Sequence, residues 1–350
     1  MSVNLFDHPF LSGLFGDEEM AAYFTAEADI AAMLRFETAL ARAQSQQGVI
    51  EDEDAQAITA GLSGFQPDMP ALKRATARDG VVIPELVKQM RKAVGGKAAE
   101  KLHFGATSQD AIDTSLMLRL NAAALVLDQR LAACIAAFTQ LDQTFGQSAL
   151  MGYTRMQPAI AMTVSARIAA WSAPLHRHRQ RLAALLADGF TVQFGGAVGT
   201  LEKLGNKGDA VRSALARDLE LTAAVQWHSQ RDRIVELADL LSLISGSLGK
   251  FGQDIALLAE VGKEIQLSGG GGSSAMPHKQ NPVAAETLVT LARFNAVQVS
   301  GLHHSLVHEQ ERSGAAWALE WMLLPQMTVA TGAATRTALQ LIGSIVRLGV

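Results

Sequence analysis

The 350-residue chain is short of several kinds of residue, and each shortage excludes a class of structure. Its single cysteine, Cys134, excludes an intramolecular disulfide and any zinc or iron–sulfur site built from several cysteines. No uninterrupted run of about 18 apolar residues is present, so we expect no membrane span. Residues 1–14 lack a basic start followed by an apolar run, so we expect no secretory signal. Together these absences favour a cytoplasmic protein.

Charge of either sign is scarce and nearly balanced. Lys and Arg number 30 against 34 Asp and Glu, and charged residues make up only 18% of the chain. We therefore expect no nucleic-acid partner, because phosphate binding requires a basic surface. A small anionic substrate is still compatible, because it needs only a few placed cations. The hydrophobic content of 49% is high for a soluble monomer and indicates helix faces buried between subunits.

Aromatic residues (5%) and prolines (nine) are also few, whereas alanine is abundant. Alanine is the best helix former, and strand-type runs of Val, Ile, Thr and Tyr are scarce, so we predict an all-α protein. Apolar residues over 234–258 recur at alternating spacings of three and four, which predicts a helix of about 60 Å over 228–267. Its glycines Gly246, Gly249 and Gly252 disfavour a helix unless a second helix passes close by.

The same periodicity predicts four further long helices. They cover about 106–145, 160–185, 283–312 and 315–348, with a bend at Pro174 and a bend or break at Pro325. We therefore expect a central domain over 106–350 that is a bundle of about five long helices. Residues 1–105 are expected to form a smaller N-terminal domain of shorter helices.

The segment Gly105–Asp110 has the pattern of a helix start. Thr107 and Asp110 are spaced as in a capping box, and an ordinary helix cap explains them. The functional alternative is an anion site, because free N–H groups and the helix dipole favour a carboxylate there. On that interpretation Thr107, Ser108 and Gln109 bind substrate.

A second helix start is predicted at 152–159, because Pro158 suits the first turn and Gln157 the cap. Arg155 precedes it and either clamps a carboxylate or is simply solvated. Arg233 is a further candidate for contact with an anion, although surface ion pairing explains it equally well.

The most specific segment is 269–282, in which four consecutive glycines predict a mobile loop. A phosphate-binding loop is excluded, because no Gly-Lys-Ser/Thr follows at the required spacing. A hydroxyl, a lysine and an amide within nine residues suit proton transfer beside a developing negative charge. In this hypothesis Ser273 moves the proton, while Lys279 and Asn281 stabilise the charge. Asn281 also has a structural alternative, as the cap of the next helix.

The run Gly272-Ser273-Ser274-Ala275-Met276-Pro277-His278-Lys279-Gln280-Asn281-Pro282 resembles the signature loop of the fumarase/aspartase superfamily. The segments 105–110 and 152–159 fall where the other two motifs of the superfamily lie. The resemblance implies a homotetrameric helical bundle, active sites that each draw on three subunits, no metal and no organic cofactor. We add to the expected substrate contacts two residues of the loop and two histidines beside the motifs, namely Ser274, Met276, His103 and His278.

Within the superfamily, the segments 105–110, 199–205 and 308–313 are more similar to a cycloisomerase branch than to adenylosuccinate lyase. That branch implies that a small tricarboxylate diene closes to a lactone through an aci-carboxylate intermediate. Arg155 stands where most superfamily lyases have an acid-catalytic histidine, which disfavours elimination of an amine. Many relatives continue into a third helical domain, which we expect this chain to lack after Val350.

Adenylosuccinate lyase-like elimination and a non-catalytic structural tetramer stay open as alternatives. Crystallins related to argininosuccinate lyase are examples of the second. The intact Ser273, Lys279 and Asn281 argue against a purely structural role, because such a chain has no need of them.

Overall fold

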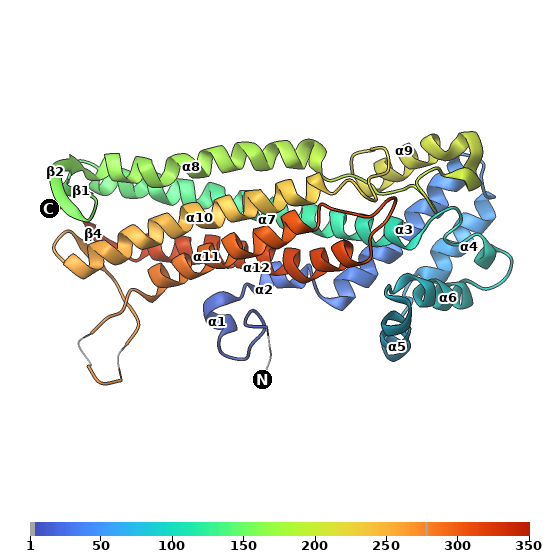
Figure 1. The fold of residues 1–350 in the computed structure, drawn as a ribbon, viewed down its shortest axis with the longest axis horizontal. Helices are drawn as coiled ribbons and strands as arrows, with labels where there is room; N and C mark the ends of the chain where they lie inside the picture. The colour runs from blue at the N-terminus through green and yellow to red at the C-terminus, as the bar shows by residue number, and fades with distance from the viewer. Residues whose placement is uncertain (1–3, 273, 277–278) are drawn as a thin grey trace.

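The computed structural model describes residues 4–272, 274–276 and 279–350. The molecule is elongated, and long helices run side by side along most of its length (Figure 1). Within the described residues this bundle consists of α7 (Ser108–Phe145), α8 (Val164–Ala184), α10 (Asp232–Val261), α11 (Val283–His304) and α12 (Ala315–Gly343). The predicted bundle of five long helices is confirmed.

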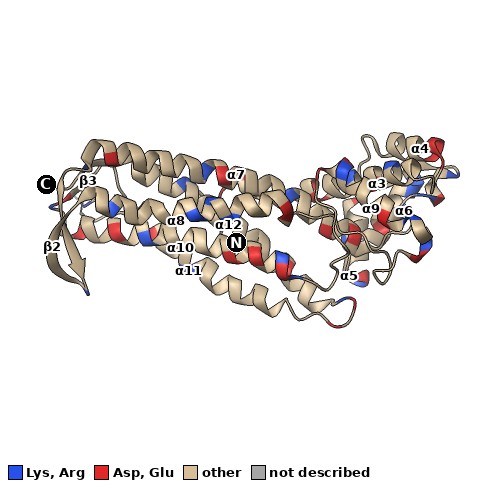
Figure 2. Ribbon diagram, turned by 90° about the horizontal axis from the view of Figure 1, so that it is seen from above, with Lys and Arg blue, Asp and Glu red and all other residues tan. Residues whose placement is uncertain are grey.

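A second group of helices, all but α3 shorter than those of the bundle, clusters at one end of it. They are α3 (Ala26–Gln46), α4 (Asp52–Leu62), α5 (Met69–Asp79), α6 (Ile83–Val94), η1 (Ala98–Glu100), η3 (Glu202–Lys207) and α9 (Gly208–Leu219). Two more, α1 (Ser12–Phe15) and α2 (Glu18–Ala22), contact α11 and α12, and η2 (Leu185–Gly189) extends α8. Charged residues are denser around the cluster than along the bundle (Figure 2). Because α9 packs against α3, residues 208–219 lie with the N-terminal helices, and the division at residue 105 stays a prediction.

Two small antiparallel sheets interrupt the helical fold. One joins β1 (Ala149–Thr154) to β2 (Gln157–Thr163), and the other joins β3 (Ile265–Leu267) to β4 (Ile345–Leu348). The predicted helix start at 152–159 is therefore wrong. Residues of that segment pair across a hairpin, and α8 begins only at Val164, where the Thr163 hydroxyl accepts a hydrogen bond from the Ala166 N–H at 3.2 Å.

Three other predicted helices end earlier in the structure than the sequence pattern indicates. The helix α10 covers 30 residues rather than about 40, because Gly262 adopts a left-handed conformation (φ 73°) that caps it. The helix α11 ends at His304 instead of 312. The helix α12 continues through Pro325 but ends at Gly343, where the chain turns into β4.

The glycines of α10 behave as the sequence predicts at two of three positions. A β carbon on Gly249 would lie 2.5 Å from the Ala292 β carbon, and one on Gly252 would lie 2.6 Å from the Ala285 carbonyl oxygen. Both contacts are with α11, so the two helices approach too closely for a side chain. A β carbon on Gly246 would meet no described atom within 4 Å beyond its own stretch of helix, so Gly246 does not share this role.

Aromatic side chains fill the contact between α7, α8 and α10. The Phe138 and Phe251 ring centroids are 5.0 Å apart, and those of Trp171 and Phe251 are 5.1 Å apart. Among the described helices, α7 is long and apolar enough by length and composition to cross a membrane. It packs here against α3, α8 and α12, and about a third of its most apolar window is buried.

Candidate active site

The first predicted motif lies at the start of α7 and is built around a buried carboxylate. The Thr107 N–H donates to Asp110 Oδ2 at 3.0 Å, so the predicted capping box is confirmed. Asp110 is fully buried and also accepts hydrogen bonds from the N–H groups of Gly195 and Gly196, each at 2.9 Å. Its Oδ1 lies 2.8 Å from His228 Nε2. Asp110 therefore also fixes the loop at Gly195 and Gly196 against the helix start.

One turn further along α7, Asp113 belongs to a buried ion-pair network. Arg231 donates to Asp113 Oδ2 at 2.6 Å and to Glu320 Oε1 at 2.9 Å, and Trp317 Nε1 donates to Asp113 Oδ1 at 2.9 Å. Burial alone would lower the pKa of the Arg231 guanidinium, but the two carboxylates outweigh it and raise the pKa. The network thus joins α7, the start of α10 and α12 below the motif.

Gln109 connects this network to the surface. Its amide nitrogen donates to Asp113 at 3.1 Å and to the His228 carbonyl at 2.9 Å, while its amide oxygen accepts from Arg312 Nε at 2.9 Å. The side chain is fully buried, so the structure places Gln109 beneath the surface rather than on it. Arg312 is exposed and also donates to the Thr107 hydroxyl at 3.3 Å.

Arg312 is a candidate that sequence reasoning missed. It belongs to the 308–313 segment, which carried a family resemblance but no assigned role. Arg233, the predicted anion contact near the start of α10, donates to the Asp188 carbonyl at 2.9 Å, and its contact with an anion stays a prediction. Arg231, two residues earlier, pairs with two carboxylates, but these are Asp113 and Glu320 of the same chain and not a ligand.

The second predicted motif is the tip of the β1–β2 hairpin. Thr154 pairs with Gln157, and the two residues between them, Arg155 (φ 48°) and Met156 (φ 66°), both have positive φ. Positive φ at both positions is typical of a type I′ turn, which suits the twist of a two-residue hairpin. All four side chains are exposed, so Arg155 and Gln157 project from the end of the molecule.

Near this hairpin a cavity of about 510 Å³ opens between β1, α8 and α10. Arg155, Arg167 and Lys250 supply positive charge to its lining, and Asp254, Glu260 and Glu264 supply negative charge. Asp254 is already engaged, because it pairs with Lys250 and accepts a hydrogen bond from Trp171 Nε1 at 2.8 Å. The cavity therefore has no uniform preference for an anion.

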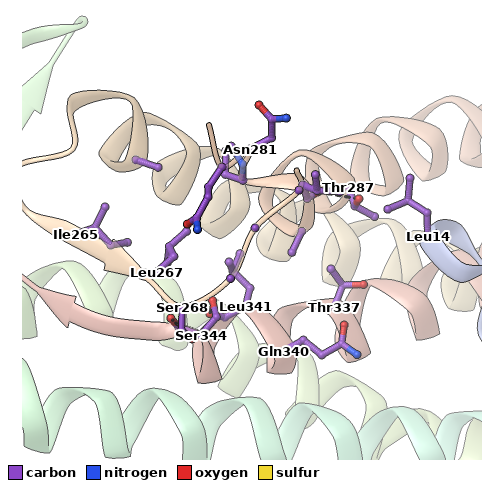
Figure 3. A pocket seen from close by; sticks show the side chains of 18 of the residues that line it. Leu14, Ile265, Leu267, Ser268, Asn281, Thr287, Thr337, Gln340, Leu341 and Ser344 are labelled. Carbon is purple, nitrogen blue, oxygen red and sulfur yellow. Dashed lines mark hydrogen bonds between the residues drawn. The ribbon is translucent and has the colours of Figure 1, made fainter. Parts of the chain in front are cut away.

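The third predicted motif is a loop closed at its base by two backbone hydrogen bonds. Gly271 and Asn281 exchange N–H···O bonds, each 2.9 Å long. Lys279, Ser274 and Met276 are exposed on the loop, whereas Ser273 and His278 lie outside the described residues. A cavity of about 640 Å³ lies below the base, between β3, α11 and α12 (Figure 3). Asn281 borders it from the loop, and Thr337, Gln340 and Ser344 border it from α12 and its end.

The described residues contain no group of three or more His, Cys, Asp or Glu side chains placed to hold a metal ion. The lone cysteine, Cys134, is buried in the bundle. Burial raises the pKa of its thiol to about 12, so it stays protonated near neutral pH.

Comparisons with known proteins agree on one family. A family model described as a lyase matches residues 9–301. The 3-carboxy-cis,cis-muconate cycloisomerase of Pseudomonas aeruginosa is 38% identical over 97% of this chain and 74% of its own length. The enzyme of that name from Pseudomonas putida is 39% identical over 91% of this chain and 79% of its own length. This chain belongs to the lyase family.

A solved structure of the family extends the agreement to the fold. The crystal structure of the 3-carboxy-cis,cis-muconate lactonizing enzyme from Pseudomonas putida matches with a TM-score of 0.90 at 36% identity. The match covers 97% of this chain and 77% of that chain. The predicted membership of the superfamily and the predicted helical fold are both confirmed.

The three motifs of this lyase-family chain do not meet within one copy. The first lies at the Ser108 end of α7, and the β1–β2 hairpin follows the Phe145 end of the same 38-residue helix. At 1.5 Å per residue these ends are about 57 Å apart. The third motif lies at the hairpin end, where β3 pairs with β4 and the Ala149 N–H donates to the Val350 carbonyl at 3.2 Å. The first motif is therefore far from the other two within a single chain, and the expected sharing of each active site among three subunits stays a prediction.

Proposed function

We propose that this protein catalyses the lactonisation of 3-carboxy-cis,cis-muconate to 4-carboxymuconolactone. The observation that carries the proposal is the similarity, over nine-tenths of the chain, to relatives named for this cycloisomerisation. The complete signature run over 272–282 supports it, because a chain with only a structural role would not need those residues. The substrate is a small tricarboxylate, and the protein works in the cytoplasm.

In the proposed reaction one carboxylate oxygen of the diene forms a bond to a carbon of the double bond. The displaced electron pair moves onto a neighbouring carboxylate, which becomes an aci-carboxylate stabilised by Lys279 and Asn281. Ser273 then delivers a proton to the adjacent carbon, and the carboxylate form returns. The attacking carboxylate loses its charge as it becomes an ester, so the trianion takes up one proton overall, which solvent returns to Ser273. Counted as free acids, substrate and product are isomers.

The remaining carboxylates need fixed positive partners. Thr107 and Ser108 present hydroxyls at the α7 N-terminus, where the helix dipole favours an anion. Arg312 adds a full positive charge beside them, because its guanidinium is already held against the Thr107 hydroxyl. Arg155 and Gln157 contribute from the hairpin tip. Further contacts are proposed for Arg233, Ser274, Met276, His103 and His278, while Gln109 acts by holding Arg312.

We propose that the active site is shared between copies in a homotetramer. The separation of about 57 Å along α7 means that one chain cannot place its first and second motifs on one small substrate. Apolar side chains at the hairpin also need cover, because Met156 is 71% and Ile160 is 76% exposed. Thr107→Val and Arg155→Ala variants would each be inactive alone. Reassembled together, they would regain part of the activity, because some sites would combine the intact motifs.

Turnover is the direct test of the function. The purified, metal-free protein is mixed with 3-carboxy-cis,cis-muconate, and loss of diene absorbance and formation of lactone are followed together. We expect rapid conversion, with a large loss of kcat and retained binding in Ser273→Ala. Absence of conversion by a folded tetramer would overturn the proposal. Conversion of adenylosuccinate would then identify an elimination, and inertness toward both would favour a structural role.

A further inference from the structure

The residue that leads into the first motif has an unusual backbone and a buried partner. His103 has a φ of 61°, which is uncommon for a residue other than glycine and indicates a conformation imposed by its surroundings. Its Nδ1 lies 2.6 Å from Glu37 Oε1 of α3. The Glu37 side chain is 1% exposed and that of His103 is 12% exposed. The acid is therefore sealed from solvent, and the imidazole is only slightly exposed.

The backbone on both sides of His103 is held independently. Arg91 of α6 donates to the Leu102 carbonyl at 3.1 Å, and Gln44 of α3 donates to the Phe104 carbonyl at 2.6 Å. These two bonds already position the segment. The bond from Glu37 to the ring is therefore not needed to hold the loop, and its distinctive effect is on the ring itself.

That effect is electrostatic. The charged groups that act on the ring are Glu37 of α3, Asp110 of α7 and Arg91 of α6. Burial lowers the pKa of His103, but the charge and hydrogen bond of Glu37, with the charge of Asp110, outweigh it, so the net pKa is raised. The second carboxylate oxygen of Glu37 is buried and has no hydrogen-bond partner among the described residues. The carboxylate is thus directed at His103 alone.

The other ring nitrogen is available. No described residue hydrogen-bonds to His103 Nε2, and this nitrogen is not among the buried polar atoms that lack a partner, so it is open to a ligand. The His103 carbonyl accepts a bond from the Ala106 N–H at 3.3 Å, so the ring belongs to the turn that delivers Thr107 to the helix start. An imidazolium N–H at this position is a charge-assisted donor for a substrate carboxylate, in addition to the hydroxyls of the motif.

We propose that Glu37 is a positioning residue that keeps His103 in the imidazolium form and turned toward a substrate carboxylate held at the start of α7. The inference rests on the proposed function for the identity of that carboxylate. It assigns a role to a buried acid 66 positions away in the sequence, which no motif includes.

The test uses Glu37→Gln, which retains a hydrogen-bonding side chain without its charge. We expect the alkaline limb of the kcat/KM profile to move to lower pH. Above that limb, KM for 3-carboxy-cis,cis-muconate rises by about ten- to a hundredfold while kcat changes less, as expected for loss of a charged hydrogen bond. Below it the variant approaches wild-type activity. The ring titration of His103, followed by NMR in the substrate-free protein and assigned by its loss in His103→Gln, moves in the same direction.

Gln44→Leu is the matched control, because it loosens the same segment without changing the charge near the ring. It is expected to leave both the pH limb and the ring titration where the wild type has them. An unmoved limb or an unmoved titration in Glu37→Gln would overturn the proposal, as would equal shifts in Gln44→Leu. If Glu37→Gln does not fold, His103→Gln decides: it cannot titrate, so a retained alkaline limb would overturn the role of the ring.

The two proposals fail in different ways. A wild-type protein that does not turn over the muconate overturns the proposed function, whereas the NMR titration needs no substrate. A His103 pKa that Glu37→Gln leaves unchanged overturns the positioning role whatever the substrate is.

Discussion

The two ends of α7 carry polar motifs that are built in opposite ways. At the Ser108 end, Gln109, Asp110 and Asp113 are fully buried, and each makes several hydrogen bonds to segments that are distant in the sequence. At the Phe145 end, Arg155 and Lys279 are exposed, and backbone hydrogen bonds close the hairpin and the base of the loop that carry them, while the Met151 N–H of β1 also donates to Glu264 Oε1 at 2.7 Å.

This difference distinguishes a motif that is formed within one chain from motifs that another copy and the substrate complete. Buried charges must be paired to offset the loss of their hydration. The partners lie in the same chain, so the first motif is rigid before any ligand arrives. Exposed charges contribute little to stability, so the hairpin and the loop are free to be arranged by another copy and by substrate. Substitutions at the two ends should therefore affect stability and turnover in opposite proportions.

The largest expected effect is on stability at the Ser108 end. Arg231→Met removes the partner of two buried carboxylates, Asp113 and Glu320, and should lower the free energy of unfolding by about 3–5 kcal/mol. Urea unfolding followed by circular dichroism measures it. The control is Arg42→Met, which breaks a partly exposed pair with Asp218 and should cost less than about 1 kcal/mol. Equal losses would contradict the contrast between buried and exposed pairs.

A pair of glutamines compares the two ends directly. Gln109→Leu removes one acceptor of Arg312 and one of the donors to Asp113, so we expect a loss of about 1–3 kcal/mol and a raised KM. Gln157→Leu, at the exposed hairpin, should change stability by less than about 0.5 kcal/mol. Unfolding midpoints and steady-state kinetics on both variants decide it. A Gln109→Leu protein with wild-type stability and KM would contradict the proposal that buried Gln109 holds Arg312 in place.

At the Phe145 end the effect should fall on turnover alone. Lys279→Ala removes the charge proposed to stabilise the aci-carboxylate and should lower kcat by about a hundred- to a thousandfold. Because the side chain is exposed, the free energy of unfolding should change by less than about 0.5 kcal/mol. Lys73→Ala, at an exposed position on α5, is the control for loss of a surface lysine. A Lys279→Ala protein with wild-type kcat would exclude Lys279 from the reaction.

The last prediction concerns α8, between the two ends, where the buried His178 pairs with no carboxylate among the described residues. His178 bonds to the Ser247 hydroxyl at 2.8 Å, and burial, with Arg181 and Arg177, lowers its pKa from 6.5 to about 4. The neutral form is favoured in the fold, so its contribution is complete above pH 6.5 and is lost as pH falls toward 4. Denaturation at several pH values should show this loss in the wild type and a weaker one in His178→Gln. The exposed His176→Gln should follow the wild type, and an identical slope in all three would refute the assignment.

Prediction from sequence succeeded where the cause is local. The period of apolar residues locates each long helix, and the capping box at Thr107 and Asp110 needs only neighbours three positions apart. It failed at Pro158, which suits a helix start by itself but lies in β2. There the pairing of Thr154 with Gln157, closed by a turn with two positive φ angles, decides the outcome. Helix ends were also predicted wrongly where the chain pairs with a distant segment. The helix α12, for example, ends at Gly343 because the residues that follow pair as β4 with β3.

The sequence by itself determined the helical fold class, the family and the signature loop, because these depend on residue type and short spacing. Only the tertiary structure decided which polar side chains are buried supports and which are free to meet a ligand. Gln109 was a predicted contact and is buried, whereas Arg312, 203 positions away, lies on the surface above it. Such roles depend on charges that meet across the fold, and one chain's sequence does not record which distant residues become neighbours.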